Sequence, residues 1–294
     1  MKKHKNTHLI SILFSAPYLL LFLFFTVIPV IISVVLSFTN YNILEPASFK
    51  GIDNYLKLFL EDDVFMTAIR NTFLLAAVTG PVGYMMCLFV AWMLNEFGPK
   101  VRAVLTLVFY APSISGAVYA IWAIIFSSDS YGIINNMLQN MGFINEPIQW
   151  LQNPKYILMV VMLAQIWISL GTSFLSFIAG LQGVDPTLYD AGAVDGIKNR
   201  IQELWYITIP SIRPQLMFGA VIQISTSFAI SDICNTLAGF PSVDYSAHTI
   251  VTHMMDYGTT RFELGTACAI AVILFAIMVT FNQLINRLIK NAGK

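Results

Sequence analysis

The stretch YDAGAVDGIKNRIQELWYITIPSIRP, residues 189–214, decides how the 294-residue chain is organised. Charged residues gather in it, whereas the chain as a whole is 57% hydrophobic and only 11% charged. Long apolar runs lie on both sides. Because exposed polar backbone is not tolerated in lipid, a polar segment between two apolar runs has to lie in water on one side of a membrane. We therefore expect a loop at residues 184–214, the central loop, outside the lipid.

The central loop reads as two short helices. At the start of the first, Asp185 is placed to accept a backbone N–H and Pro186 suits the first helical position, while Gly196 suits a left-handed end. The second helix opens at Asn199, with a glutamine three residues on as in a capping box. We expect two prolines, Pro210 and Pro214, to close it.

The first of these helices is rich in small residues. Ala191, Gly192 and Ala193 leave one flank almost without side chains, with the carboxylates of Asp190 and Asp195 beside it. Glycine inside a helix costs about 1 kcal/mol relative to alanine, so Gly192 calls for a close packing contact. This flank is either a docking surface for another protein backbone or part of an ordinary solvated loop.

Composition places the whole chain among all-α, multi-span membrane proteins. Its mean hydropathy is +0.71 and 13% of its residues are aromatic, which is too apolar for a soluble domain. The net charge of zero argues against a nucleic-acid partner.

The first apolar run, residues 9–38, follows a basic segment at residues 1–8. As one helix it would be about 45 Å long, against a hydrocarbon core of about 30 Å, so we expect tilt or a kink at Pro17 or Pro29. A cleaved signal peptide is the alternative, but its core would be shorter. Five more runs complete six transmembrane helices: Thr67–Leu94, Val104–Phe126, Tyr156–Leu181, Gln215–Leu237 and Glu263–Asn286.

The positive-inside rule orients these spans. The side that holds both termini and the central loop carries eleven of the sixteen basic residues: Lys2, Lys3, Lys5, Lys100, Arg102, Lys198, Arg200, Arg213, Arg287, Lys290 and Lys294. The predicted organisation is therefore a cytoplasmic N-terminus at 1–8, a first transmembrane helix at 9–38, a five-helix core at 67–286 that includes the loop at 184–214, and a cytoplasmic C-terminus at 287–294.

Polar residues recur within two of the spans. In the fourth, Gln165, Ser169, Thr172 and Ser176 are spaced as on one face of a helix, and in the fifth Gln223, Thr226 and Ser227 are spaced likewise. Such stripes either line a pathway for a polyhydroxylated solute or hold helices together by hydrogen bonds. The aromatic side chains expected to offer stacking surfaces for such a solute are Tyr119, Trp122, Trp167 and Phe228.

Several kinds of site have no signature in the sequence. There is no GxxxxGK[ST] motif, so the chain binds no ATP by a P-loop, and no set of groups suits catalysis within the spans. Cys87, Cys234 and Cys268 fall in apolar runs and predict neither a disulfide nor a metal site. No basic residue lies deep in a span, which favours a neutral solute over an anionic one.

The central loop resembles the EAA loop of ABC importer permeases, in which Glu-Ala-Ala is followed by Asp-Gly and then by a helix ending in Ile-Thr-Leu-Pro. The matching residues are Asp190, Ala191, Gly192, Asp195, Gly196, Ile207, Thr208, Ile209 and Pro210. Asp190 stands in place of the Glu, Gly192 in place of the second Ala and Ile197 in place of the Ala after the Asp-Gly. The spacing from Gly196 to Pro210 is one residue longer than the pattern.

The resemblance extends over nearly the whole chain, to the sugar-permease branch that includes maltose and glycerol-phosphate importers. It rests on Ala16-Pro17, Ser37-Phe38-Thr39, Phe49-Lys50-Gly51-Ile52-Asp53-Asn54-Tyr55, Asn71-Thr72, Trp122, Gly132 and Asn135. In the maltose relative the substrate-contacting residues lie on the helices either side of the EAA loop. The resemblance therefore implies a substrate pathway at Gln165, Ser169, Thr172, Gln223, Thr226 and Ser227.

The resemblance implies a type I ABC importer in the bacterial inner membrane, with a second permease, two ATPase subunits that bind ATP and Mg, and an extracytoplasmic solute-binding protein. Its implied ATPase-coupling residues are Asp190, Ala191, Gly192, Asp195 and Gly196, on a helix that docks into an ATPase. We expect Gly192→Trp to block this docking.

Three alternatives to a neutral-sugar importer stay open at this point. One is an importer of glycerol phosphate or a related anion. The second is an ion-coupled secondary carrier, which would need acids within the membrane to bind its ion. The third is a multi-span membrane enzyme.

Overall fold

A computed structural model of the chain describes residues 12 and 14–291, and all regular elements in this part are helices. The segment 1–8, the start of the predicted first span and residues 292–294 lie outside the described residues. The chain forms two compact units. Unit 1 comprises residues up to 63 together with 253–275, and unit 2 comprises residues 64–252 and 276 onward.

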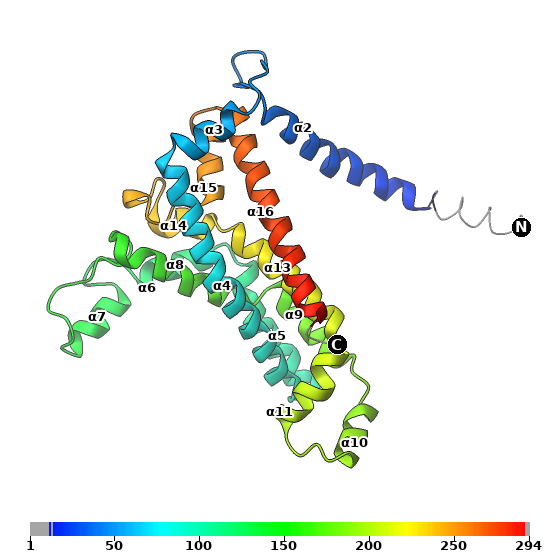
Figure 1. The fold of residues 1–294 in the computed structure, drawn as a ribbon. Coiled ribbons are helices and arrows are strands. Elements are labelled where there is room, and N and C mark those ends of the chain that lie inside the picture. The colour runs from blue at the N-terminus through cyan, green and yellow to red at the C-terminus, as the bar shows by residue number, and fades with distance from the viewer. Residues whose placement is uncertain (1–11, 13, 292–294) are drawn as a thin grey trace, which may run out of the picture. The chain divides into compact units, whose positions relative to one another are not determined.

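Unit 1 contains the first membrane span, a helix at Phe14–Leu36. Within it a π-helical turn, η1 (Leu23–Val27), precedes α2 (Ile28–Leu36), which carries Pro29 in its first turn (Figure 1). A proline ring clashes with the carbonyl four residues earlier, and a wider π-helical turn relieves that clash. Proline is thus accommodated here without ending the helix.

The rest of unit 1 is held together by polar side chains. After α2 the chain turns back to α3 (Asp53–Leu60), where the buried amide of Asn54 donates to the carbonyls of Ser37 (2.8 Å) and Thr39 (2.9 Å). The unit also contains η4 (Asp256–Thr260) and the first part of α16 (Leu264–Asn291).

A titratable cluster lies in the interior of unit 1. One oxygen of Asp62 accepts a hydrogen bond from the hydroxyl of Tyr257 (2.9 Å) and lies 3.0 Å from Nε2 of the fully buried His253. The guanidinium carbon of Arg261 lies 4.4 Å from the centroid of the Tyr257 ring, and one of its nitrogens forms an ion pair with a carboxylate oxygen of Asp256 at 2.6 Å. The cluster therefore links the residue before the second span to the segment before the sixth.

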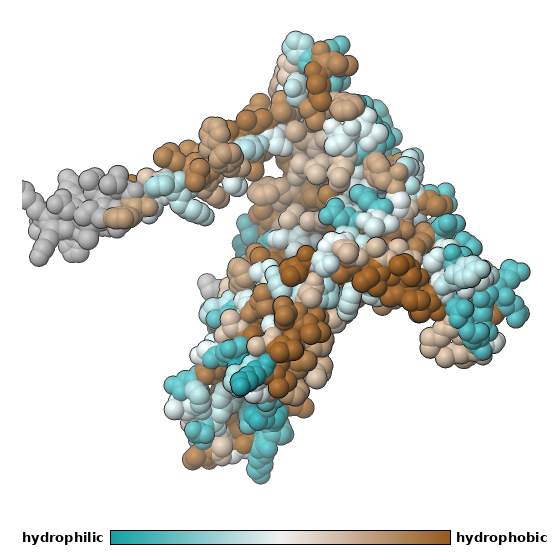
Figure 2. All heavy atoms as spheres, turned by 180° about the vertical axis from the view of Figure 1, so that it is seen from behind, coloured by the Kyte–Doolittle hydropathy of each residue, from teal (hydrophilic) through white to brown (hydrophobic). Residues whose placement is uncertain are grey.

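Unit 2 holds the remaining elements. They are α4 (Asp63–Asn95), α5 (Pro99–Ile114), α6 (Val118–Ile125), α7 (Ile133–Asn140), α8 (Pro154–Ile168), α9 (Thr172–Gln182), α10 (Thr187–Val194), α11 (Arg200–Glu203), η2 (Leu204–Thr208), α12 (Ile209–Ser211), α13 (Arg213–Phe228), α14 (Asp232–Ala238) and η3 (Val243–Tyr245). α15 (Ile250–Met255) begins here and ends in unit 1. Hydrophilic side chains gather around α7 and around α10 and α11, with hydrophobic ones on the face between them (Figure 2).

Three of the predicted spans are interrupted. Among the described residues five helices are long and apolar enough to cross a membrane, and α5 with α6 makes a sixth that bends by 82° at its break. The predicted run Val104–Phe126 is thus two helices, separated at residues 115–117 close to Pro112 and Gly116. The fourth span breaks at residues 169–171 and the fifth at 229–231.

Two hydrophobic clusters pack within unit 2, and each break separates them along the chain. The outer cluster, named for the side that the sequence predicts to face away from the cytoplasm, includes Phe126, Trp150, Val160 and Ile233, from α6, α8, α14 and the segments beside them. The inner cluster includes Leu94, Phe174, Phe177, Ile212 and Leu216, with side chains of α5 packed against it. Among the described helices α4 alone runs unbroken through both clusters, contributing Leu75 to the outer one and Cys87 to the inner one.

The loop between α6 and α8 is organised by Asn135. This fully buried amide donates to the carbonyls of Ser127 (3.1 Å), Asp129 (3.1 Å) and Ile148 (3.0 Å). Its oxygen accepts from the backbone of Ile148 (3.1 Å) and from the indole N–H of Trp150 (2.8 Å).

We expect Asn135→Ala to lower the free energy of unfolding by about 2 to 4 kcal/mol, because it leaves several buried donors and acceptors without partners. Thermal unfolding of the purified protein in detergent would measure this. Asn136→Ala is the control, since Asn136 is exposed and accepts only from the amide of Asn140 in the same loop. Equal melting temperatures for the two variants would contradict the assigned role of Asn135.

We also expect unit 1 to loosen as the pH falls. Burial lowers the pKa of His253 below 6.5, and the carboxylate of Asp62 offsets only part of that effect. The pKa of His253 is therefore higher in the unfolded chain than in the folded one. The stability that depends on the neutral His253 ring is complete above a pH of about 6.5, and it is lost as the pH falls through the folded-state pKa. We would measure backbone hydrogen exchange at residues 253–263, corrected for intrinsic rates, in the unmodified protein and in His253→Gln. When the pH is lowered from about 7.5 to about 5.5, the exchange rate should rise more in the unmodified protein than in the variant. The same pH response in both proteins would refute the assignment.

Candidate functional site

The interrupted spans meet α4 in one layer of small and polar residues, which we call the break layer: Gly80, Gly83, Ser113, Ser169, Gly171, Gln223 and Ser227. A Cβ atom placed on Gly171 would lie 3.5 Å from Cβ of Ser113, so the break of the fourth span contacts the end of α5, next to the break of the third span. A Cβ on Gly83 would lie 2.5 Å from Nε2 of Gln223 and 2.8 Å from Oγ of Ser169. Glycine at position 83 therefore allows the fourth and fifth spans to bring polar groups together against α4.

The predicted pathway residues divide into three groups. Ser169, Gln223 and Ser227 lie in the break layer, whereas Thr172 and Thr226 are exposed on α9 and α13. Gln165 is half-buried on α8. Whether these residues form a pathway stays a prediction.

The prediction that the polar residues of the fourth span share one helical face was wrong. α8 ends at Ile168 and α9 begins at Thr172, so the helical register is lost between them. The N–H of Gly171 bonds instead to the carbonyl of Ser169 at 2.7 Å.

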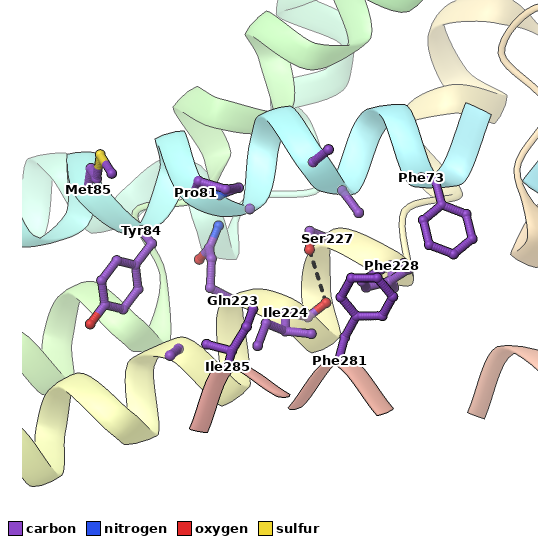
Figure 3. A pocket seen from close by; sticks show the side chains of 14 residues that line it. Phe73, Pro81, Tyr84, Met85, Gln223, Ile224, Ser227, Phe228, Phe281 and Ile285 are labelled. Atoms are coloured by element: carbon purple, nitrogen blue, oxygen red, sulfur yellow. Dashed lines mark hydrogen bonds between the residues drawn. The ribbon is translucent and has the colours of Figure 1, made fainter. Parts of the chain in front are cut away.

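A pocket of about 320 Å³ adjoins the break layer, between α4, α13 and the second half of α16 (Figure 3). Its wall is almost entirely apolar. The hydroxyl of Ser227 donates to the carbonyl of Ile224 (3.0 Å), and the amide of Gln223 points toward α4, 3.5 Å from the carbonyl of Thr79. These two side chains thus bond to backbone carbonyls, Ser227 within α13 and Gln223 across to α4, and the pocket itself offers a sugar few partners.

The predicted stacking surfaces also divide. Phe228 is buried against Phe73 and Phe281, with ring centroids 5.6 and 5.1 Å away, so the expectation that it is free to stack on a solute was wrong. The ring centroids of Trp122 and Trp167 are 5.9 Å apart, and Trp167 is 36% exposed. Trp167 precedes the break of the fourth span by two residues.

The central loop has most of the predicted local structure. The backbone N–H of Thr187 donates to Asp185 (2.9 Å), and this bond lowers the pKa of the Asp185 carboxyl. Gly196 has φ +95° after α10, and Asn199 accepts from the N–H of Gln202 (2.9 Å). Pro210 does not close the helix as predicted, because the π-helical turn η2 precedes it and α12 carries it in its first turn.

Gly192 faces the protein interior rather than a partner. Its Cβ position lies 2.6 Å from Cδ1 of Ile207 and 3.0 Å from Cδ1 of Ile197, both in the same loop. The expectation that Gly192→Trp acts by blocking docking is therefore corrected: the added ring would push α10 away from η2. On the same helix Asp190 and Ala191 are exposed, as are Asp195 and Gly196 just beyond it.

The sequence interpretation missed Gly80, Gly83, Ser113 and Gly171. Their signal was present as glycine and proline within apolar runs, at Gly80, Pro81 and Gly83 in one span and at Pro112 and Gly116 in another. In secondary transporters, paired interruptions of membrane helices mark a binding site near the middle of the membrane.

No model of a known protein family matches the chain. The probable ABC transporter permease protein YesP of Bacillus subtilis is 32% identical over 287 residues, which cover 95% of this chain and 90% of YesP. The chain belongs to the ABC transporter permeases. It is a transport subunit that carries no ATPase site of its own.

Two further comparisons agree with this assignment. The lactose transport system permease protein LacF of Rhizobium radiobacter is 29% identical to the permease, over 92% of this chain and 91% of LacF. A crystal structure of a bacterial alginate ABC transporter, in complex with an alginate pentasaccharide-bound periplasmic protein, matches all of this chain and 98% of its own with a TM-score of 0.80 and 25% identity.

Proposed function

We propose that the permease carries an oligosaccharide across the bacterial inner membrane as part of a binding-protein-dependent importer. The names of its relatives support a sugar substrate, since LacF serves lactose and the solved neighbour serves alginate. The relatives named here give no support to glycerol phosphate, and membership of this family argues against a secondary carrier or a membrane enzyme.

The proposed assembly has three kinds of partner protein besides lipid. A second permease completes the pathway, two ATPase subunits bind ATP and Mg, and an extracytoplasmic protein delivers the sugar. In the alginate complex a periplasmic protein holds the bound pentasaccharide. The exposed residues of α10 dock into an ATPase, with both termini on the same, cytoplasmic side. Closure of the ATPases on ATP turns the spans outward, and hydrolysis returns them inward.

The sugar passes the break layer. The observation that carries this proposal is the contact of Gly171, in the break of the fourth span, with Ser113 at the end of α5, two residues before the break of the third span. Backbone groups freed by a break are costly in lipid and are tolerated where they line a cavity or are buried in protein. The exposed hydroxyl of Thr172 and the partly exposed ring of Trp167 flank the break, and a hydroxyl with an aromatic face suits a pyranose ring.

A neutral sugar is the favoured cargo. Among the described residues of unit 2, Lys100, Lys155 and Arg213 lie at the ends of helices, and no basic side chain belongs to the break layer. An anion crossing the membrane would need a cation near its path. Alginate, the cargo of the solved neighbour, is an acidic polysaccharide, so an acidic oligosaccharide is the competing cargo to test.

Uptake by proteoliposomes that hold the complete importer tests this proposal. With loaded binding protein outside and ATP inside, we expect a neutral oligosaccharide to be taken up, and Thr172→Val to raise its half-saturating concentration about three- to tenfold through loss of one hydrogen bond. Because the Thr172 side chain is exposed, the variant should assemble normally.

Thr280→Val is the matched control, since Thr280 is exposed on α16 and its hydroxyl bonds only its own helix, to Ala276 at 2.7 Å. An unchanged half-saturating concentration in Thr172→Val would remove Thr172 from the pathway. Uptake of acidic oligosaccharides alone would overturn the neutral cargo.

A further inference from the structure

Two residues fasten α10 to the next helical segment of the central loop. Tyr189 and Gly192 are three positions apart, so they share one face of α10, and both contact η2. The hydroxyls of Tyr189 and Thr208 are 3.0 Å apart, and Gly192 packs against Ile207. Thr208 and Ile207 are both buried. The contact therefore combines an apolar part with a part-buried hydrogen bond.

The hydrogen-bond direction follows from the third partner. The hydroxyl of Thr208 also lies 3.2 Å from the carbonyl oxygen of Glu203, to which it donates. Its lone pairs are then available, so the phenol of Tyr189 donates to it. Phenylalanine at 189 would remove this donor and leave the ring in place.

η2 continues without a loop into the helix that reaches the break layer. Ser211 donates to the carbonyl of Ile207 (2.6 Å), and the N–H of Ile212 donates to the carbonyl of Thr208 (3.0 Å). α13 begins at Arg213 and carries Gln223 and Ser227 into the break layer. Since Ile212 is buried in the inner hydrophobic cluster, this junction is anchored in the membrane-spanning part of unit 2.

The opposite side of α10 is open. Val194 is 87% exposed, and Leu188, Ala191 and Asp195 are also exposed. Arg200 makes ion pairs with Glu96 (3.0 Å) and Glu203 (2.7 Å), but its side chain is 63% exposed and such pairs contribute little. The part-buried contact between α10 and η2 is therefore expected to be the stronger of these connections within the loop.

We propose that Tyr189 and Thr208 are positioning residues that make α10 and η2 move as one body, so that a displacement of α10 is passed to α13 and the break layer. The proposal rests on the proposed docking of an ATPase to the exposed side of α10. It separates holding an ATPase, which needs the exposed side, from transmitting its motion, which needs the Tyr189–Thr208 bond.

The test uses the complete importer in proteoliposomes and measures co-purified ATPase, ATP hydrolysis and sugar taken up per ATP. We expect Tyr189→Phe and Thr208→Val each to keep the ATPase and to hydrolyse ATP within about twofold of the unmodified importer. Sugar taken up per ATP should fall at least about fivefold in both, and the double variant should be no worse than either, because the two residues share one bond.

Two controls match these variants. Tyr206→Phe removes a hydroxyl from an exposed ring of η2, and Thr208→Ser keeps the hydroxyl in place, so both should retain the uptake per ATP. An unchanged ratio in Tyr189→Phe, or additive losses in the double variant, would overturn the inference. The inference would also be overturned if the amount of ATPase that co-purifies with Tyr189→Phe fell in proportion to its sugar uptake. Absence of an ATPase from the unmodified importer would instead refute the proposed function.

Discussion

The need to satisfy every polar backbone group inside a membrane is the constraint on which unit 2 depends. Within hydrocarbon an unbonded N–H or C=O costs several kcal/mol, and three spans of this chain are nevertheless interrupted. Their neighbours supply partners for the freed groups. The carbonyl of Ser169 accepts from the N–H of Gly171 and the thiol of Cys87, and the carbonyl of Ile230 accepts from the hydroxyl of Thr249.

These breaks divide unit 2 into an outer and an inner hydrophobic cluster that share the continuous helix α4. A packed cluster moves as a body, whereas a broken helix can change its angle at little cost, so motion within the unit is expected to concentrate in the break layer. The central loop is connected to the inner cluster through Ile212 and α13. A displacement of α10 by an ATPase would then be transmitted to the break layer, where we propose that the sugar passes.

The sequence predicted those features that depend on local patterns. The apolar runs predicted the membrane spans. Asp185, Gly196 and Asn199 predicted the caps and turns of the central loop, because caps and turns are determined by neighbouring residues. The helix breaks were missed, because Gly and Pro occur in membrane helices both with and without a break, and only packing decides between these. Gly192 was assigned to the wrong side of its helix for the same reason: its nearest contact, Ile207, is fifteen residues away in the chain.

The position of the bound sugar tests the central claim most directly. An electron cryomicroscopy structure of the assembled importer, trapped with a transported oligosaccharide, would measure it. The account predicts sugar density beside the breaks of the third and fourth spans, within contact distance of Ser169 or Thr172. Sugar density remote from both breaks, with residues 115–117 and 169–171 packed only against protein, would contradict it.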